Sequence, residues 1–171
     1  ELSLPAERLN FISKEPSVRY RGFFINDEWP SFGSWTTGMF GDFNAQMYDK
    51  MFQLLLRMKG NYLWPAMWSA SFPLDGPGLG NMELADLYGV VMGESHHEPC
   101  CRASEEWDKV RGVDTVYGNE WNFYTNREGL LRYWDEALAR NSKYETMITI
   151  GMRGERDSSM LGDHSSLQQN I

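Results

Sequence analysis

Residues 42–68 have the sequence DFNAQMYDKMFQLLLRMKGNYLWPAMW, in which a helix pattern is followed at once by a strand pattern. Apolar side chains recur every three or four residues, which predicts an amphipathic helix that ends at Gly60 and has Asp42 as its N-cap. The apolar face consists of Phe43, Met47, Met51, Leu54, Leu55 and Met58. Residues 61–68 are then a strand candidate that leaves its sheet near Pro65.

The same alternation of strand and helix extends to both sides of this unit. Before it, residues 21–26 form a short apolar strand that Pro30 interrupts, and a loop follows over 31–42. After it, we expect a loop at 73–80, helices at 82–88, 105–110 and 127–140, and strands at 89–93 and 144–150. Four strand-then-helix units predict an α/β fold with a parallel sheet. No glycine-rich phosphate loop follows the first strand, which disfavours a dinucleotide or P-loop fold.

Composition narrows the class of partner. The 171 residues carry a formal net charge of −8, which disfavours nucleic acid, and no apolar run approaches the ~20 residues of a membrane span. The aromatic content of 14% fits either a carbohydrate cleft or a bulky core. Cys100 and Cys101 are neighbours, so they predict no disulfide framework.

The ends of the strands carry the candidate site residues. Asp27 and Glu28 follow the first strand, and because neighbouring strand residues point oppositely, we expect one of them to face a site. The alternative is a turn before Pro30. Trp64 and Trp68 follow the second strand and form either a sugar platform or a plug in the core.

Residues 94–101, Glu-Ser-His-His-Glu-Pro-Cys-Cys, are the densest polar cluster. His, Glu and Cys are zinc ligand types, but the spaced Cys-x-x-Cys pair of zinc deaminases and the His-Glu-x-x-His motif are both absent. We therefore expect no metal and no cofactor, and interpret the histidines, His96 first, as hydrogen-bond donors to an anionic or hydroxylated ligand.

Arg153 and Asp157 lie in a glycine-bearing turn after the fourth strand. An arginine there is suited to bidentate capture of a carboxylate, and an acid four residues later could serve as a general base. The alternative is an internal ion pair between the two that shapes the loop.

Four stretches together resemble one family. They are residues 20–30 (YRGFFINDEWP), 55–68 (LLRMKGNYLWPAMW), 96–99 (HHEP) and 151–154 (GMRG). In this order and spacing, the chain resembles glycoside hydrolase family 115, the xylan α-1,2-glucuronidases, from about residue 19 to residue 157. It departs from the family pattern at Cys100-Cys101, where apolar residues are usual, and at Glu155-Arg156.

The resemblance implies a fold and an activity. It implies that residues 19–171 are the first half of a (β/α)₈ TIM barrel, truncated, and that residues 1–18 are a lead-in from a preceding domain. Members of the family remove glucuronic acid or its 4-O-methyl ether from glucuronoxylan and its oligosaccharides with inversion, without a metal or cofactor. Many are exported, so we expect a secreted or periplasmic parent protein, and a homodimer of that parent is a further expectation.

The resemblance also implies roles for individual residues. Asp27 and Asp157 correspond to catalytic carboxylates, and His96 and Arg153 to substrate-binding residues. Asn26 and Trp64 complete the set of substrate-binding candidates. An inverting glycosidase needs a second carboxylic acid roughly 6.5–9.5 Å from the base, which we expect beyond Ile171.

Two other interpretations stay open. One is a non-catalytic, carbohydrate-binding half-barrel. The other is an inactive fragment, because half of a closed barrel leaves open sheet edges and uncovered apolar surface. The chain starts at Glu1 and its residues 165–171 complete no element, so we expect both ends to be cuts.

Overall fold

Three parallel strands form the sheet, and they lie side by side in chain order. The computed structural model describes residues 3, 5–10, 12–26, 28–151, 153–155 and 158. Its strands are β1 (Gly22–Phe24), β2 (Tyr62–Trp64) and β3 (Val91–Met92), paired in the order β1-β2-β3. Leu63 of the central strand lies opposite Phe23 on one side and Met92 on the other. The α/β class and the parallel sheet expected from the sequence are thus confirmed.

Helices precede and connect the strands. They are α1 (Ala6–Leu9), α2 (Gly33–Phe40), α3 (Ala45–Arg57), α4 (Phe72–Asp75), α5 (Gly80–Tyr88), α6 (Ser104–Val110) and α7 (Arg127–Asn141). Two short turns are η1 (Glu28–Phe32) after β1 and η2 (Pro99–Cys101) after β3. None of the helices in the described part of the chain is long and apolar enough to cross a bilayer.

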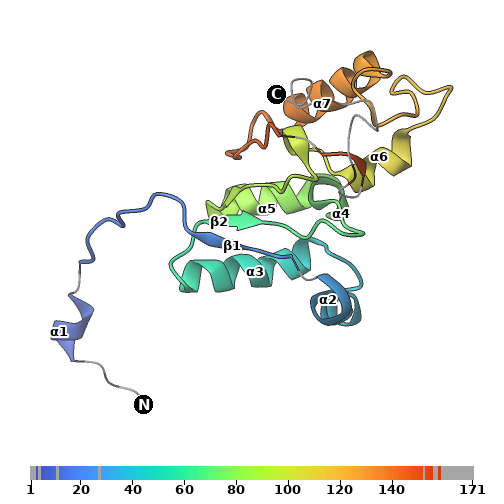
Figure 1. Cartoon of the computed structure of the whole chain (residues 1–171). Helices are drawn as coiled ribbons and strands as arrows, with labels where there is room; N and C mark the ends of the chain where they lie inside the picture. The colour runs from blue at the N-terminus through green and yellow to red at the C-terminus, as the bar shows by residue number, and fades with distance from the viewer. Residues whose placement is uncertain are drawn as a thin grey trace.

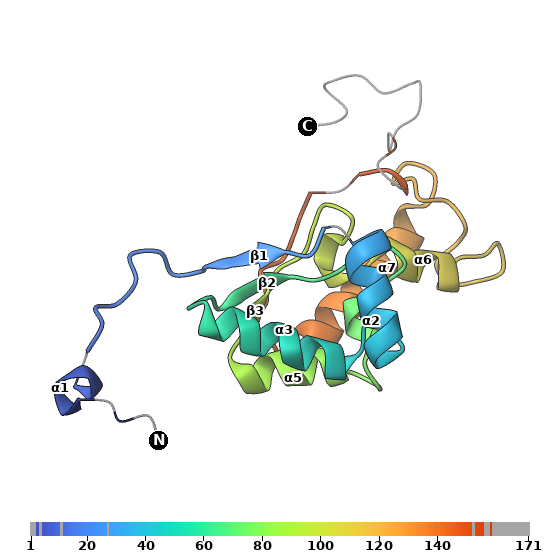
Figure 2. The same cartoon turned by 90° about the horizontal axis from the view of Figure 1, so that it is seen from below.

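α3 and α5 pack side by side on one face of the sheet (Figures 1 and 2). The core lies between these helices and the strands, with Met47 and Leu55 of α3, Met82 of α5 and Leu63 of β2 all buried. The apolar face predicted for the first helix is therefore the face that α3 turns to the sheet, although Leu54 and Met58 remain exposed.

The opposite face of the sheet is aromatic and only half-buried. Phe24 follows Phe23 and Trp64 follows Leu63 along their strands, so Phe24 and Trp64 point to this opposite face. The rings of Phe24 and Trp64 meet edge to face with centroids 5.1 Å apart. The Trp64 indole N–H donates to the Tyr62 hydroxyl. Gly93 must lack a side chain here, because a Cβ at this position would collide with both Tyr62 and Trp64.

A second layer stands on the far side of β3, where α6 and α7 pack together (Figure 1). Its core is built from Trp107, Trp121, Tyr133 and Trp134, whose rings meet mostly edge to face. Three of the seven tryptophans are thus consumed by packing, which accounts for part of the aromatic content without a carbohydrate cleft.

A buried ion-pair network fixes this layer. Arg102 donates to Glu106 at 2.7 Å and lies 3.9 Å above the ring of Tyr133, while Arg140 of α7 donates to the same Glu106 at 3.1 Å. Both Arg102 and Glu106 are more than nine-tenths buried. Arg102 also lies 3.4 Å from the Glu136 carboxylate, so two cations face two anions, as buried charges require.

Two segments predicted as loops contain helices. Residues 33–40 form α2, although glycines at both ends and in the middle of this stretch weaken the helix signal. Tertiary packing outweighs propensity, because Thr36 is fully buried and Phe32 and Phe40 pack against the main core. α4 overlaps the start of the loop predicted at 73–80, with Pro73 at its first turn.

The predicted fourth strand, residues 144–150, is reduced to one parallel bridge between Thr146 and Met92. Because β3 is only two residues long, the ladder ends once Met147 has donated its N–H to the Met92 carbonyl at 2.8 Å. Beyond that point Thr149 pairs with the loop that follows β3. Met147, Ile148 and Ile150 remain exposed.

The predicted N-cap of α3 is also wrong by two residues. Asn44 caps the helix by accepting from the N–H groups of Gln46 and Met47, and Asp42 instead accepts from Phe43.

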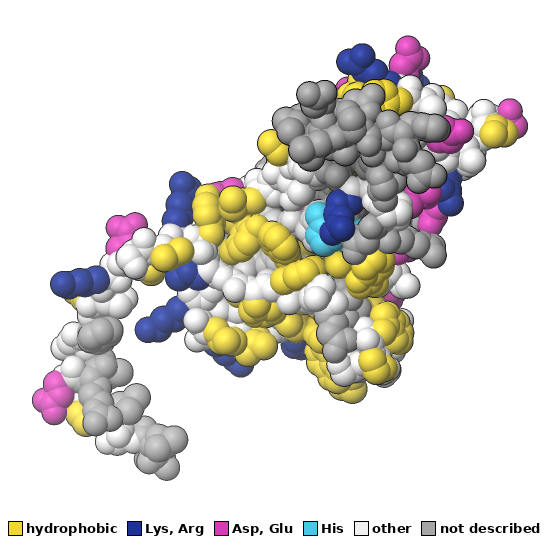
Figure 3. Space-filling view, in the orientation of Figure 1, with side chains coloured by type: hydrophobic (Ala, Val, Ile, Leu, Met, Phe, Trp, Pro, Cys, Tyr) yellow, Lys and Arg dark blue, Asp and Glu magenta, His cyan; other side chains and the backbone are white. Residues whose placement is uncertain are grey.

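Apolar side chains gather over β1, β2 and α2 on the face seen in Figure 3. Trp29, Trp35 and Met39 contribute to the exposed apolar surface of this region.

Candidate active site

The carboxyl ends of the parallel strands meet at one edge, and the candidate residues follow them. Asn26 comes two residues after β1 and is exposed. Trp64 ends β2 and is half-buried, with its ring on the aromatic face of the sheet. His96 follows β3 and is half-buried. This is the edge at which parallel α/β folds build their sites.

His96 and His97 form a ring cluster with Trp68. The two imidazole centroids lie 4.4 Å apart, and the His97 ring meets the Trp68 indole edge to face at 4.6 Å. His97 is 4% exposed, whereas His96 keeps part of its surface open. The structure therefore makes His96 the histidine that a ligand can reach and His97 its packed support.

Residues 94–101 carry the histidines and are called the histidine loop. Hydrogen bonds among polar groups of this loop hold its backbone. The Ser95 hydroxyl donates to the sulfur of Met67 at 2.9 Å and accepts from the His97 N–H at 3.2 Å. The Ser95 N–H in turn donates to the Glu98 carboxylate at 3.0 Å. Since Ser95 and Glu98 are buried, these bonds are shielded from water and fix the loop backbone.

Glu94 is the second buried acid of the loop. Burial first, and then the negative charge of Glu98, raise the pKa of Glu94 well above its ordinary value. Its carboxyl group contacts the thiol of Cys101, and burial together with the Glu94 carboxyl raises the pKa of that thiol to about 12. Cys101 is therefore a protonated hydrogen-bond donor, and both cysteines are free of disulfides, as their adjacency predicted.

Arg153 is exposed and lies near the C-terminal end of the described residues. The Trp121 indole N–H donates to its carbonyl at 2.8 Å, which ties the segment to the α6–α7 layer. Glu155 pairs with Arg111 of the same layer. Two catalytic candidates, Asp27 and Asp157, lie outside the described residues, so their separation and their relation to Arg153 stay predictions.

The zinc interpretation finds no support in the geometry. Among the residues that the structure describes, no three His, Cys, Asp or Glu side chains come together in a group that could hold a metal ion. The polar groups of Ser95 and Glu98 are instead engaged with the loop backbone and Met67, and the Glu94 carboxyl group contacts Cys101.

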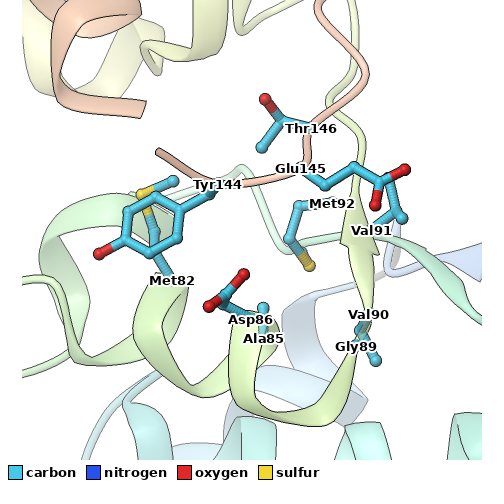
Figure 4. Close-up of a pocket in the computed structure, with 10 residues that line it drawn as sticks. All are labelled: Met82, Ala85, Asp86, Gly89, Val90, Val91, Met92, Tyr144, Glu145 and Thr146. Carbon is cyan, nitrogen blue, oxygen red and sulfur yellow. The ribbon is translucent and has the colours of Figure 1, made fainter. Parts of the chain in front are cut away.

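A pocket elsewhere on the sheet is distinct from this edge (Figure 4). It lies between α5, β3 and the Tyr144–Thr146 segment, and in Figure 4 Met82 lies beside the ring of Tyr144. Gly89 and Val90, which precede β3, belong to its wall. It is therefore at the amino end of the strand, away from the histidine loop, and none of the predicted site residues lines it.

Sequence reasoning missed the residue that holds the site together. The Thr149 hydroxyl donates to the Glu94 carbonyl at 2.7 Å, and the Thr149 backbone carbonyl accepts from the Cys100 N–H at 2.9 Å. Thr149 therefore contacts both ends of the histidine loop. The sequence offered only a β-branched residue in a presumed strand. Glu94 and Glu98 were visible as polar neighbours of the histidines, but their burial was not.

Comparisons with known proteins show the family of the chain. The model of glycosyl hydrolase family 115 matches residues 13–171. A solved structure, BtGH115A, is described as a family GH115 4-O-methyl-α-glucuronidase with specificity for decorated arabinogalactans; it superposes with a TM-score of 0.77 at 34% identity. The superposition covers 91% of this chain and 20% of that one, so this chain spans about a fifth of its relative. None of the curated proteins matches. The chain belongs to glycosyl hydrolase family 115.

Proposed function

We propose that this chain contributes one half of the active site of a glycoside hydrolase that removes glucuronic acid, or its 4-O-methyl ether, from glucuronoxylan with inversion of configuration. The observation that carries the proposal is the gathering of His96, His97 and Trp68 at the carboxyl edge of a parallel sheet in a chain of this family. The half-exposed His96 imidazole and the half-buried Trp68 indole, which both contact the buried His97 ring, offer a polar and a flat apolar contact to a sugar.

The proposed architecture is the first half of a (β/α)₈ barrel. Strand order follows chain order, and the bridge to Thr146 places the next segment beside β3, as the next barrel strand would lie. The half-buried aromatic face with Phe24 and Trp64 corresponds to the barrel interior, which the remaining strands would close. Residues 1–18 are then a lead-in to residues 19–171.

The proposed roles follow from charge. A uronate is an anion, and a protein of net charge −8 needs a local cation to hold it. Arg153 and His96 supply that contact, and Asn26 and Trp64 contact the sugar. Asp157 acts as the base that activates water, with Asp27 as the second site carboxylate of this half. The general acid comes from a part of the fold that this chain does not include.

The substrate and its location belong to the same proposal. The solved relative is specific for decorated arabinogalactans, so the family accommodates more than one backbone. We propose glucuronoxylan for this chain, and an exported parent enzyme, since the polymer lies outside the cell that degrades it.

The test is a chimera in which this chain replaces the matching fifth of the solved relative. It is assayed on glucuronoxylan and on a decorated arabinogalactan, next to the chain alone. We expect uronic acid release from glucuronoxylan by the chimera only, because the chain alone lacks the acid. ¹H NMR at early times should show the β-anomer as the first product of an α-linked substrate.

The controls separate the competing functions. A chimera that unfolds cooperatively, binds xylan oligosaccharides and releases no uronate would support a non-catalytic binding module instead. Release from arabinogalactan alone would contradict the glucuronoxylan assignment while leaving the hydrolase. An α-anomeric first product would rule out inversion.

A further inference from the structure

Two carboxylic acids are buried on the loop that carries the histidines. Glu94 is 7% exposed and Glu98 is 2% exposed, and only three residues separate them. Two negative charges this close in a water-poor environment repel each other strongly, so the loop favours a state with a single charge. The question is which carboxyl group keeps a proton.

The hydrogen bonds assign the proton to Glu94. The Glu98 carboxylate accepts the Ser95 N–H at 3.0 Å, which favours its charged form. Oε2 of Glu94 is buried and has no hydrogen-bond partner among the residues that the structure describes. A buried carboxylate oxygen without a donor is far costlier than a buried carboxylic acid.

The groups around Glu94 come from three further elements. Cys100 and Cys101 face it from η2, Glu106 from α6 and Arg140 from α7. Arg140, the cation among these groups, is already engaged by the Glu106 carboxylate at 3.1 Å. The balance around Glu94 is therefore not positive, and it does not favour a second carboxylate.

Glu94 also stands where the two halves of the edge are joined. Its carbonyl accepts from the Thr149 hydroxyl at 2.7 Å, and Thr149 leads four residues later to Arg153. Its carboxyl group contacts Cys101 at the far end of the histidine loop. The backbone of Glu94 thus connects the histidine loop with Thr149, and its side chain connects the start of the loop with Cys101 at the end.

We propose that Glu94 is a positioning residue, which as a neutral acid clamps the loop 94–101 and so holds His96 and His97 in place for the substrate. Its use for a uronate rests on the proposed function, whereas the clamp itself does not. Glu94 is too deeply buried to meet the sugar, so it acts through the histidines.

The experiment uses the whole chain labelled with ¹⁵N in its histidines. Glu94→Ala removes the side-chain contact with Cys101 and leaves the backbone bond to Thr149 in place. Glu94→Gln keeps a neutral group of the same shape with an acceptor for the Cys101 thiol, and Glu15→Gln changes an exposed acid as a matched control. We expect the ring signals of His96 and His97 to shift or broaden in Glu94→Ala and to return to wild-type positions in Glu94→Gln. A Glu94→Ala spectrum identical to that of Glu15→Gln would overturn the proposal.

A pH series supplies a readout that simple packing would not change. As pH rises, wild-type Glu94 must ionise beside Glu98, so the histidine signals should move in a step that Glu94→Gln lacks. The same step in Glu94→Gln would contradict the proposal. This arm holds even where Glu94→Ala fails to fold, because the glutamine variant preserves the shape of the site.

Titration with sodium glucuronate separates the clamp from the proposed function. We expect glucuronate to shift the His96 signal, and Glu94→Ala to bind it about tenfold more weakly, the effect of losing roughly one hydrogen bond. If glucuronate moves no signal while Glu94→Ala still disturbs both histidines, the assignment of His96 as a uronate contact fails and the clamp stands. If glucuronate binds wild type and Glu94→Ala equally, the clamp has no role in positioning.

Discussion

Arg153 is the residue whose predicted role the structure leaves most open to a direct test. It is exposed, and its carbonyl accepts a hydrogen bond from the indole N–H of Trp121. In the chimera we expect Arg153→Ala to raise KM for a uronate-bearing substrate about tenfold, since a hydrogen bond to a charged group contributes about 1.5–3 kcal/mol. The unfolding free energy should change by less than about 0.5 kcal/mol, as at most exposed positions.

The matched control for Arg153 is Arg132→Ala, which removes an exposed arginine of α7. Steady-state kinetics and thermal unfolding of both variants decide between the two interpretations of Arg153. Unchanged kinetics with a marked loss of stability in Arg153→Ala would favour the loop-shaping ion pair over uronate capture.

Glu94 makes the stability of the chain depend on pH in a defined direction. Its pKa in the folded chain lies above the ordinary 4.5, so the folded state retains a proton that the unfolded state releases. Stability is therefore highest at low pH as far as this group is concerned, and it falls as pH rises above 4.5 toward the folded-state value.

Glu94→Gln should remove that dependence. Relative to wild type, we expect its urea midpoint to be similar near pH 4 and progressively higher as the pH rises, because the amide never ionises. Denaturation curves at several pH values, with Glu15→Gln as the exposed control, measure the difference. Parallel pH profiles for wild type and Glu94→Gln would show that Glu94 is not held in its neutral form.

At the scale of elements, α3 offers a choice between two caps. Asn44 accepts from two helix N–H groups and its amide donates to the Phe40 carbonyl at 2.8 Å, whereas Asp42 accepts only from Phe43. We expect Asn44→Ala to lower the unfolding free energy by about 1 kcal/mol, the usual cost of losing an N-cap. Asp42→Ala should cost clearly less, as measured by urea denaturation; the reverse order would restore the cap predicted from sequence.

The elements also show what a pattern can and cannot predict. α3 and α7 were predicted because their apolar residues recur with the helical period, which is a property of the local sequence, and α5 and α6 were expected as short helices. α2 was missed because its glycines and threonines give a weak local helix signal, whereas the burial of Thr36 and the packing of Phe40 on the core depend on the rest of the fold. The fourth strand was over-predicted since β-branched residues mark a strand, but the two-residue length of its partner limits the ladder.

The site was predictable to the same extent. Polar residues that follow an apolar strand predicted the carboxyl edge of the sheet, where His96 and Trp64 lie, as the candidate site. Which of them are buried depends on contacts across the fold, such as the ring of Trp68 on His97 or the thiol of Cys101 at Glu94. No spacing rule encodes those contacts, so Glu94 and Thr149 emerged only from the structure.

At the scale of the whole molecule, uncovered apolar surface dominates. Large side chains such as Trp29, Trp35, Met39 and Ile150 are exposed, and β1 has a free edge among the described residues. A surface of this kind binds hydrophobic dyes and favours association. We expect the isolated chain to enhance the fluorescence of an apolar dye at neutral pH and the chimera to do so far less.

Near-ultraviolet circular dichroism accompanies that comparison. A chain that binds the dye and retains its aromatic signal is folded with an open side, and one that loses the signal is a molten fragment. Absence of dye binding together with cooperative unfolding would mean that the chain covers its own apolar surface, against this expectation.

Thr149 also imposes an order on biosynthesis. The Thr149 hydroxyl donates to the carbonyl of Glu94, which lies 55 positions earlier in the chain. The histidine loop therefore leaves the ribosome well before Thr149 does. By then the strands β1 to β3 and the helices α3 and α5 are complete and can pack. A nascent chain that stops short of Thr149 would therefore carry a formed sheet and a histidine loop held by the bonds among Met67, Ser95 and Glu98. The link from this loop to the segment that follows α7 is then among the last contacts to form during synthesis.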